Sequence, residues 1–197
     1  MVQNRYPANI SNEELEEMEL IEFEEKIIVV ERMNRLYYQA IEELCNAKIL
    51  GFDTETKPSF RAHSPRNKVA ILQLSAGEKN YIFRLQLLGI PKELADILSD
   101  PNIIKVGAAV KEDVRGLNAY TSFEGRGFVD LQEMVGKYGI EVKSLKKMAA
   151  IILGERISKS QQLSNWEAQV LTEAQLRYAA IDAWVCREMY LTLIDDE

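Results

Sequence analysis

Apolar positions along the chain change from short continuous runs to runs in which they recur every three or four residues. Short apolar runs bounded by turn residues indicate buried strands, and the longer spacing indicates amphipathic helices. The pattern predicts strands at residues 26–31, 49–53, 69–75, 80–83 and 103–107. It predicts helices at residues 11–25, 35–46, 91–98, 112–118, 144–153 and 172–194, and another that follows Phe128-Val129-Asp130 and ends near Tyr138.

The order of these elements favours an α/β fold. Strands dominate the first half of the chain and alternate with helices in the second, which is typical of a mixed central β-sheet flanked by α-helices. Gly77 marks a hairpin turn and Gly154 the end of a helix. Residues 57–68 contain two prolines and are expected to form a loop beside any site at the end of the second strand.

The N-terminal segment, residues 1–25, is predicted to be an acidic helical arm appended to a domain at residues 26–197. Ser11 with Glu14 three residues later matches a capping box at the start of a helix. The apolar residues of the segment would let it dock on the main body, and the alternative is a solvated helical face. These residues are Leu15, Met18, Leu20, Ile21 and Phe23.

Length and composition indicate one globular domain. The chain has 197 residues, of which 47% are hydrophobic. No apolar run reaches the length of a membrane-spanning helix, and the first residues lack the apolar core of a signal peptide. Cys45 and Cys186 lie in helical patterns without metal-ligand spacing, so core thiols in a reduced compartment are expected. A cytoplasmic protein without membrane contact is the prediction.

The formal net charge of −7 is concentrated in the arm. Residues 1–25 hold eight glutamates and one basic residue, and the remaining 23 acidic and 23 basic residues balance. The acidic net charge disfavours tight non-specific binding of nucleic acid. It does not exclude a local binding site, because the position of the charges matters more than their sum.

Two carboxylates, Asp53 and Glu55, stand two residues apart at the end of a predicted strand. Side chains at this spacing point to the same side of a strand. Two adjacent carboxylates repel each other unless a cation neutralises them. A turn after a strand is the alternative explanation for this short motif.

Three further residues extend the pattern. Asp113 follows a buried strand at the start of a helix, where it would also interact favourably with the helix dipole, and the neighbouring Glu112 is a rival for the same role. Tyr178 and Asp182 lie four residues apart and share one helix face. The alternative for this pair is a core tyrosine with an incidental acidic neighbour. Clustered carboxylates with almost no histidine suit Mg²⁺ or Mn²⁺, and two such ions could clamp a phosphoryl group. A metal-dependent nuclease is the leading hypothesis.

In this order the motifs resemble those of the DEDD superfamily of 3′–5′ exonucleases, in its tyrosine subtype, and most closely ribonuclease D and Werner-syndrome-type exonuclease domains. The resemblance spans roughly residues 26–193. It rests on three blocks and on weaker similarities at Phe128 to Leu131, Ser144-Leu145, Ser164 to Trp166 and Leu171-Thr172. The three blocks are Phe52-Asp53-Thr54-Glu55, Val106-Gly107 through Asp113, and Tyr178-Ala179-Ala180-Ile181-Asp182-Ala183.

The resemblance implies an RNase H-like fold and a two-metal mechanism that releases nucleoside 5′-monophosphates from a 3′ end. Asp53 would bridge two Mg²⁺ or Mn²⁺ ions, Glu55 and Asp182 would ligate the ion that holds the attacking water, and Asp113 would serve the second ion. Tyr178 would orient the water, since a phenol with a pKa of about 10 is a poor base at neutral pH. Trp166 is expected in the core.

The subtype follows from the position of the tyrosine. The histidine subtype carries its base five residues before the last aspartate, where this chain has Arg177. The one histidine, His63, lies in the predicted loop and is expected at the surface or near substrate. Val170 stands where many relatives have proline, and the helical domains that follow in ribonuclease D are expected to be missing after Glu197. A stand-alone or recruited exonuclease domain is therefore expected.

The expected partner is nucleic acid with a single-stranded or recessed 3′ end, without a resolved preference for DNA or RNA. Candidate phosphate contacts are basic residues, although solvated side chains explain them equally well. These residues are Lys57, Arg61, Lys68, Lys143, Lys146 and Lys159. Two other functions stay open: a catalytically silent scaffold that binds nucleic acid or protein, and a phosphodiesterase for very short oligonucleotides.

Overall fold

The computed structural model describes residues 5–59 and 67–196 of the chain. Its centre is a six-stranded mixed sheet with the spatial order β1-β4-β3-β2-β5-β6. The antiparallel pairs are β2 with β3 and β3 with β4, and the other neighbours run parallel. The strands are β1 (Lys26–Val30), β2 (Ile49–Thr56), β3 (Val69–Ser75), β4 (Lys79–Arg84), β5 (Ile104–Gly107) and β6 (Phe128–Asp130).

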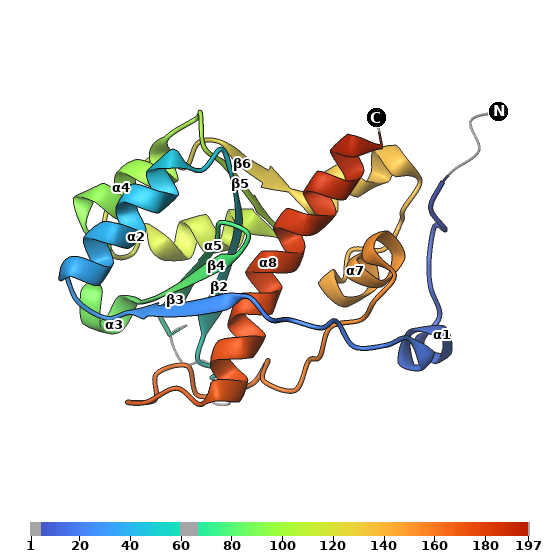
Figure 1. Ribbon diagram of the computed structural model, residues 1–197, viewed down its shortest axis with the longest axis horizontal. Helices are drawn as coiled ribbons and strands as arrows, with labels where there is room; N and C mark the ends of the chain where they lie inside the picture. The colour runs from blue at the N-terminus through green and yellow to red at the C-terminus, as the bar shows by residue number, and fades with distance from the viewer. Residues whose placement is uncertain (1–4, 60–66, 197) are drawn as a thin grey trace.

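Helices cover both faces of this sheet (Figure 1). One face packs against α2 (Arg35–Asn46), α3 (Leu85–Leu88), α4 (Lys92–Ser99) and α5 (Val110–Leu117). The other is crossed by the long α8 (Glu173–Asp195), with α7 (Leu145–Leu153) beside it. The remaining helices are α1 (Asn12–Glu17), α6 (Leu131–Met134) and the 3₁₀ helix η1 (Val135–Tyr138). The mixed sheet between helical layers matches the predicted fold class.

Two strand predictions were incomplete. β2 continues to Thr56 instead of ending at Asp53, because β3 pairs with it in antiparallel register along Asp53, Thr54 and Glu55. The three-residue β6 was predicted only as a lead into a helix; it is a strand because Val106 and Gly107 of β5 pair with it. Such pairing depends on distant residues, which local periodicity does not report.

The predicted helix over residues 11–25 was wrong in its second half. The capping box of Ser11 and Glu14 is present, but α1 ends at Glu17. Beyond it, Ile21 and Phe23 are buried while their neighbours are exposed, which is the period of an extended chain. The extended conformation is stabilised by the backbone of Arg156, which exchanges two hydrogen bonds with this segment at 2.9 and 3.0 Å.

The two cysteines differ. Cys186 is buried in α8, as predicted, but Cys45 is exposed, so its assignment to the core was wrong. Cys45 falls on the solvent face of α2, since Tyr37, Ala40, Ile41 and Leu44 form the buried face. Trp166 is fully buried, as predicted. Among the described residues, no helix is long and apolar enough to cross a membrane.

Candidate active site

Three carboxylates meet where β2 passes beneath α8. Asp53 and Glu55 come from one face of β2, and Asp182 comes from α8. One oxygen from each of the three lies within 4.8 Å of the others. We call Asp53, Glu55 and Asp182 the acidic centre. The fourth predicted acid, Asp113, lies beside this group.

A glycine in β2 allows α8 to approach the sheet this closely. A Cβ added at Gly51 would lie 1.9 Å from the carbonyl oxygen of Ala183, closer than any real contact. The helix face above it is also small, because Ala179, Ala180 and Ala183 are buried there. The helix backbone therefore rests directly on the strand, which brings Asp182 to the two strand carboxylates.

Burial and mutual repulsion both act on the acidic centre. Burial, followed by the charges of Asp182 and Asp113, raises the pKa of Glu55 to about 9. Burial also raises the pKa of Asp182 to about 7, against a hydrogen bond from Tyr178 and the charge of Lys159. The pKa of Asp53 is raised by burial, then by Glu55, Asp182 and Asp113. Without cations, ionising all three together is unfavourable.

The acidic centre fits divalent cations by a further criterion. Asp182 is 6% exposed, yet its Oδ1 atom has no hydrogen-bond partner. A buried carboxylate oxygen without a partner is costly, and coordination of a cation removes the cost. The donor set consists of hard oxygen ligands, which Mg²⁺ and Mn²⁺ prefer.

Asp113 is held next to the acidic centre by a contact that sequence reasoning missed. The hydroxyl of Thr54, the residue between Asp53 and Glu55, donates a hydrogen bond of 2.5 Å to Asp113 Oδ1. Burial raises the pKa of Asp113 to about 6, although this hydrogen bond lowers it. The rival Glu112 is exposed and forms an ion pair with Arg115. Of the two neighbouring acids, Asp113 therefore lies beside the acidic centre and Glu112 lies at the surface.

Asp130 fixes the start of the helix that carries Asp113. Its carboxylate accepts hydrogen bonds from the backbone N–H groups of Ala109 and Val110, at 3.0 and 3.2 Å. Ala109 has a left-handed backbone, with φ of 60°, which is uncommon for a residue other than glycine. The sequence signals at this position were the acid at the end of a short apolar run and the family resemblance of Phe128 to Leu131.

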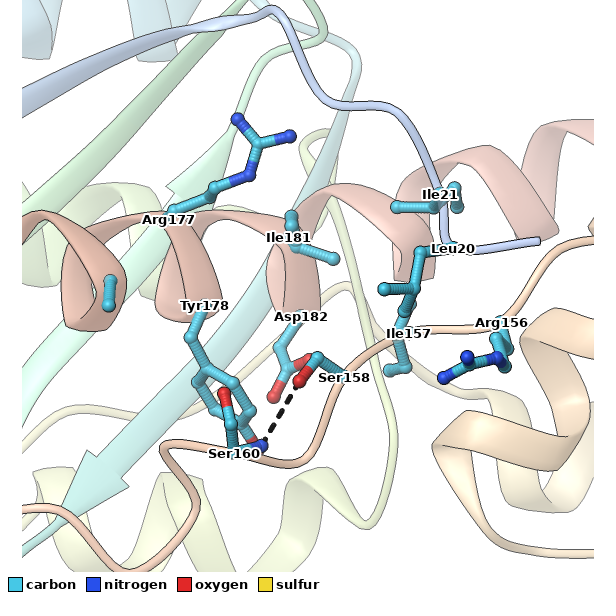
Figure 2. A pocket seen from close by; sticks show the side chains of 11 residues that line it. Leu20, Ile21, Arg156, Ile157, Ser158, Ser160, Arg177, Tyr178, Ile181 and Asp182 are labelled. Atoms are coloured by element: carbon cyan, nitrogen blue, oxygen red, sulfur yellow. Dashed lines mark hydrogen bonds between the residues drawn. The ribbon is translucent and has the colours of Figure 1, made fainter. Parts of the chain in front are cut away.

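Tyr178 lies one helical turn before Asp182, and the two side chains project from α8 to the same side (Figure 2). The ring of Tyr178 packs against buried Trp166 with centroids 5.9 Å apart. Burial, then the charges of Asp182 and Glu55, raises the pKa of Tyr178 above its usual value. The hydroxyl therefore stays protonated at neutral pH and donates a hydrogen bond to Asp182.

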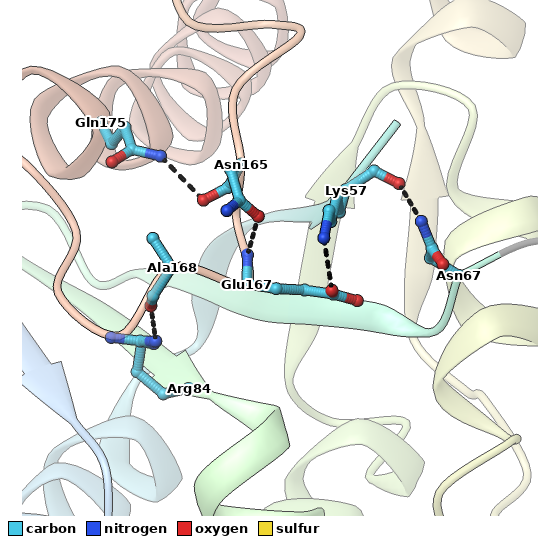
Figure 3. Close-up of polar contacts among 7 residues, drawn as sticks. All are labelled: Lys57, Asn67, Arg84, Asn165, Glu167, Ala168 and Gln175. Atoms are coloured by element: carbon cyan, nitrogen blue, oxygen red, sulfur yellow. Dashed lines mark hydrogen bonds and ion pairs between the residues drawn. The ribbon is translucent and has the colours of Figure 1, made fainter. Parts of the chain in front are cut away.

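The predicted phosphate contacts occupy different places. Lys57 and Lys68 line a hollow that also contains Asp113, but Lys57 pairs with Glu167 at 3.2 Å (Figure 3) and Lys68 stacks on Tyr120. Lys159 is exposed, and its charge acts on Asp182.

The other predicted contacts are less favourably placed. Lys143 donates to the carbonyl oxygen of Gln132, and Lys146 pairs with Glu16 of the arm at 2.6 Å. Both are therefore engaged in contacts within the protein, which weakens the case that they bind phosphate. Arg61 and His63 lie outside the described residues.

Residues 32–195 match the model of a protein family described as 3′–5′ exonuclease. The chain belongs to this 3′–5′ exonuclease family. The exonuclease 3′–5′ domain-containing protein 2 of Drosophila melanogaster is 35% identical over 153 residues, which are 76% of this chain and 26% of that protein. The chain thus spans about a quarter of this relative, and the resemblance to the DEDD superfamily is confirmed.

Solved structures establish the RNase H-like fold. The Nibbler EXO domain of Aedes aegypti superimposes with a TM-score of 0.76 and 23% identity, covering 90% of this chain and 91% of that one. Ribonuclease D of Escherichia coli gives a TM-score of 0.75 and 24% identity, covering 87% of this chain and 45% of that one. The family and the fold together place the acidic centre within an exonuclease framework.

Proposed function

We propose that the protein hydrolyses phosphodiester bonds of nucleic acid from the 3′ end, with two divalent cations, and releases nucleoside 5′-monophosphates. The observation that carries the proposal is the acidic centre itself, in a chain that belongs to the 3′–5′ exonuclease family. Carboxylates from a strand and a helix converge there, and their charges oppose one another until cations are bound.

The residues that would hold the cations are Asp53, Glu55, Asp182 and Asp113. One carboxylate oxygen from each of the first three lies within 4.8 Å of the others. The hydrogen bond from Thr54 keeps Asp113 beside them. When bound, Mg²⁺ or Mn²⁺ would lower the pKa of water and stabilise the charge that develops on the phosphate. Asp130 would act as a positioning residue, because it fixes the turn before Asp113.

Tyr178 would orient the attacking water, as proposed for the tyrosine subtype. Its protonated hydroxyl is anchored to Asp182, so it can hold a water molecule by accepting its proton in a hydrogen bond. Arg177 occupies the position of the alternative histidine base and projects away from Tyr178 (Figure 2). We therefore assign no side chain as the general base.

The proposed substrate is a single-stranded or recessed 3′ end. The charge of Lys159 acts on Asp182, and Lys57 and Lys68 line the hollow that also contains Asp113, so basic side chains lie near the acidic centre. Phosphate contacts of this kind position a strand without reading its sequence. DNA and RNA substrates both belong in the test.

The test is a panel of DNA and RNA strands labelled at the 5′ end, with single-stranded or recessed 3′ ends, in Mg²⁺, Mn²⁺ or EDTA. We expect stepwise shortening from the 3′ end with either cation. Asp53→Asn should lower the rate about 1,000-fold or more, because a cation ligand that acts on the transition state is lost. Asp96→Asn, an exposed aspartate on α4, is the matched control and should keep full activity.

Retained activity in Asp53→Asn would refute the two-metal assignment. A wild-type protein that binds Mn²⁺ in calorimetry but cleaves neither DNA nor RNA would favour a silent scaffold. Cleavage of dinucleotides in preference to 20-mers would favour the phosphodiesterase for very short oligonucleotides.

A further inference from the structure

A row of buried polar side chains lies under α8 and leads away from the acidic centre. It consists of Gln73 and Ser75 on β3 and Asn80 on β4, each of them at most 1% exposed. Within the described residues, both amide atoms of Gln73, the hydroxyl of Ser75 and the amide oxygen of Asn80 have no hydrogen-bond partner. We call these three residues the polar row. Buried polar groups without a partner are rare in folded proteins, so each of them requires an explanation.

The register of the sheet places Gln73 next to Asp53. The two residues stand directly opposite each other in the antiparallel pair of β2 and β3. Residues paired in this way point to the same face of the sheet, with Cβ atoms about 4.5–5.5 Å apart. This face is the one that α8 covers, because a Cβ at Gly51, two residues before Asp53, would point at the backbone of Ala183. The amide of Gln73 is therefore within reach of the Asp53 carboxylate.

The remaining members of the polar row can complete the hydrogen bonding of Gln73. Ser75 lies two residues further along β3, so its side chain is on the same face as that of Gln73. It stands opposite Asn80 on one side and opposite Gly51, which has no side chain, on the other. The hydroxyl of Ser75 can donate to the amide oxygen of Gln73, which leaves the amide NH₂ group of Gln73 available to Asp53.

Asp53 has room for a further hydrogen bond. The backbone of Thr54 is hydrogen-bonded to its carboxylate, and no side chain in residues 5–59 and 67–196 donates to it. A carboxylate that binds a cation is typically held by a hydrogen bond from a neighbouring group, which fixes its orientation. A neutral amide provides such a bond without adding a positive charge that would compete with the cations.

We propose that Gln73 is a positioning residue for Asp53: its amide NH₂ group donates a hydrogen bond to the Asp53 carboxylate and fixes the orientation of this cation ligand. The inference rests on the proposed two-metal function. Packing alone does not explain a glutamine here, because an apolar side chain of similar size would fill the space and leave no amide without a partner.

The experiment measures Mn²⁺ affinity by calorimetry without nucleic acid, and Tm in EDTA. Gln73→Met keeps an unbranched side chain of similar length and removes the donor. We expect its Kd for Mn²⁺ to rise about 10–100-fold, as for loss of a hydrogen bond to a metal ligand, and kcat to fall by a similar factor. KM for a short single strand should change little. Tm in EDTA should not fall, because the substitution removes a buried amide that has no partner.

Two further variants complete the comparison. Gln39→Met makes the same change at an exposed position on α2 and should alter neither the Kd for Mn²⁺ nor kcat. Gln73→Leu removes the same donor with a branched side chain, and it replaces Gln73→Met in the measurements if the latter does not fold. Loss of the thermal transition in both variants at position 73 would show a structural function and would overturn the proposal.

The other outcomes separate this inference from the proposed function. An unchanged Kd and kcat in Gln73→Met, with any effect confined to Tm in EDTA, would overturn the assignment of Gln73 and leave the exonuclease function intact. A wild-type protein that binds Mn²⁺ but cleaves no strand would refute the exonuclease function, and the two Kd values would still decide whether Gln73 positions Asp53. A wild-type protein that does not bind Mn²⁺ would overturn both.

Discussion

The acidic centre and the basic residues around it are built in different ways. The acids lie on regular elements, and their positions are set by the β2–β3 register and by the close contact of α8 with β2. The basic residues project from the surface, and several form contacts within the protein. Lys57 pairs with Glu167, Lys146 with Glu16, and Lys143 with the carbonyl oxygen of Gln132.

This difference shows which charges can be assigned a function from structure. A buried carboxylate without a compensating partner must bind a cation or keep its proton, because desolvation and repulsion are otherwise uncompensated. A surface lysine needs no ligand, since water solvates it and a nearby glutamate pairs with it at little gain. Substitutions in the acidic centre should therefore have large effects, and substitutions of the basic residues should have small ones.

The first expected effect in the acidic centre, besides the loss of activity in Asp53→Asn, is on folding and depends on pH. The pKa values of Asp182 and Glu55 are raised to about 7 and about 9, so the folded protein keeps protons that the unfolded chain releases near pH 4. Without cations, stability should fall as the pH rises from about 4 to about 9. At pH 8.5, Mn²⁺ at about 100 times its Kd should raise Tm by about 5–10 °C.

At pH 5.5 the same addition should raise Tm by less, because protons compete with the cation for the carboxylates. Thermal unfolding in EDTA and in Mn²⁺ at the two pH values measures the effect. Asp53→Asn removes one of the repelling charges, so its unfolding in EDTA should depend less on pH. Equal Tm values at both pH values, with no response to Mn²⁺, would contradict the assignment of the acidic centre.

The next effect concerns the tyrosine. Tyr178→Phe keeps the ring against Trp166 but removes the hydroxyl, so kcat should fall about 10–100-fold, as for loss of a hydrogen bond to a charged group. Single-turnover rates measure this loss. Mn²⁺ affinity should change little. Unchanged turnover would remove Tyr178 from the mechanism, whereas loss of the thermal transition would indicate a structural function.

The smallest effect separates two lysines predicted from sequence. Lys159→Ala should lower kcat/KM about 3–10-fold and reduce the salt dependence of binding by a slope of about 0.7, the value for one phosphate contact with a single strand. Lys143→Ala should change kcat/KM by less than about twofold, because surface ion contacts contribute little. Equal effects of the two substitutions would show that Lys159 has no special position beside Asp182.

Much of the fold was predictable because the periodicity is clear where packing is regular. The helix over Arg35–Asn46 has the predicted bounds, and α8 begins at Glu173, one residue after the predicted start at Thr172, which is its N-cap. The failures occur where a distant partner decides the conformation. Residues 18–25 have a helix-compatible composition, yet the backbone of Arg156 and the burial of Ile21 and Phe23 keep them extended.

The site shows the same limit. Spacing alone predicted that Asp53 and Glu55 face one side and that Tyr178 and Asp182 share a helix face, and both pairs lie this way. The choice of Asp113 over Glu112 required the hydrogen bond from Thr54, which no spacing rule contains. Lys159 lies in a loop three residues after Arg156, whose backbone is hydrogen-bonded to the arm, and no local pattern reports this contact.

The missing side chain at Gly51 has a consequence for how inactive members of such a family are recognised. The spacing between carboxylates of different elements depends on the thickness of the gap between helix and strand, and a single methyl group at this position would widen that gap. A chain can thus retain every acid and lose the dimensions on which they depend. The presence of every acid is therefore necessary for an active nuclease but not sufficient. The residue at position 51 has to be checked as well.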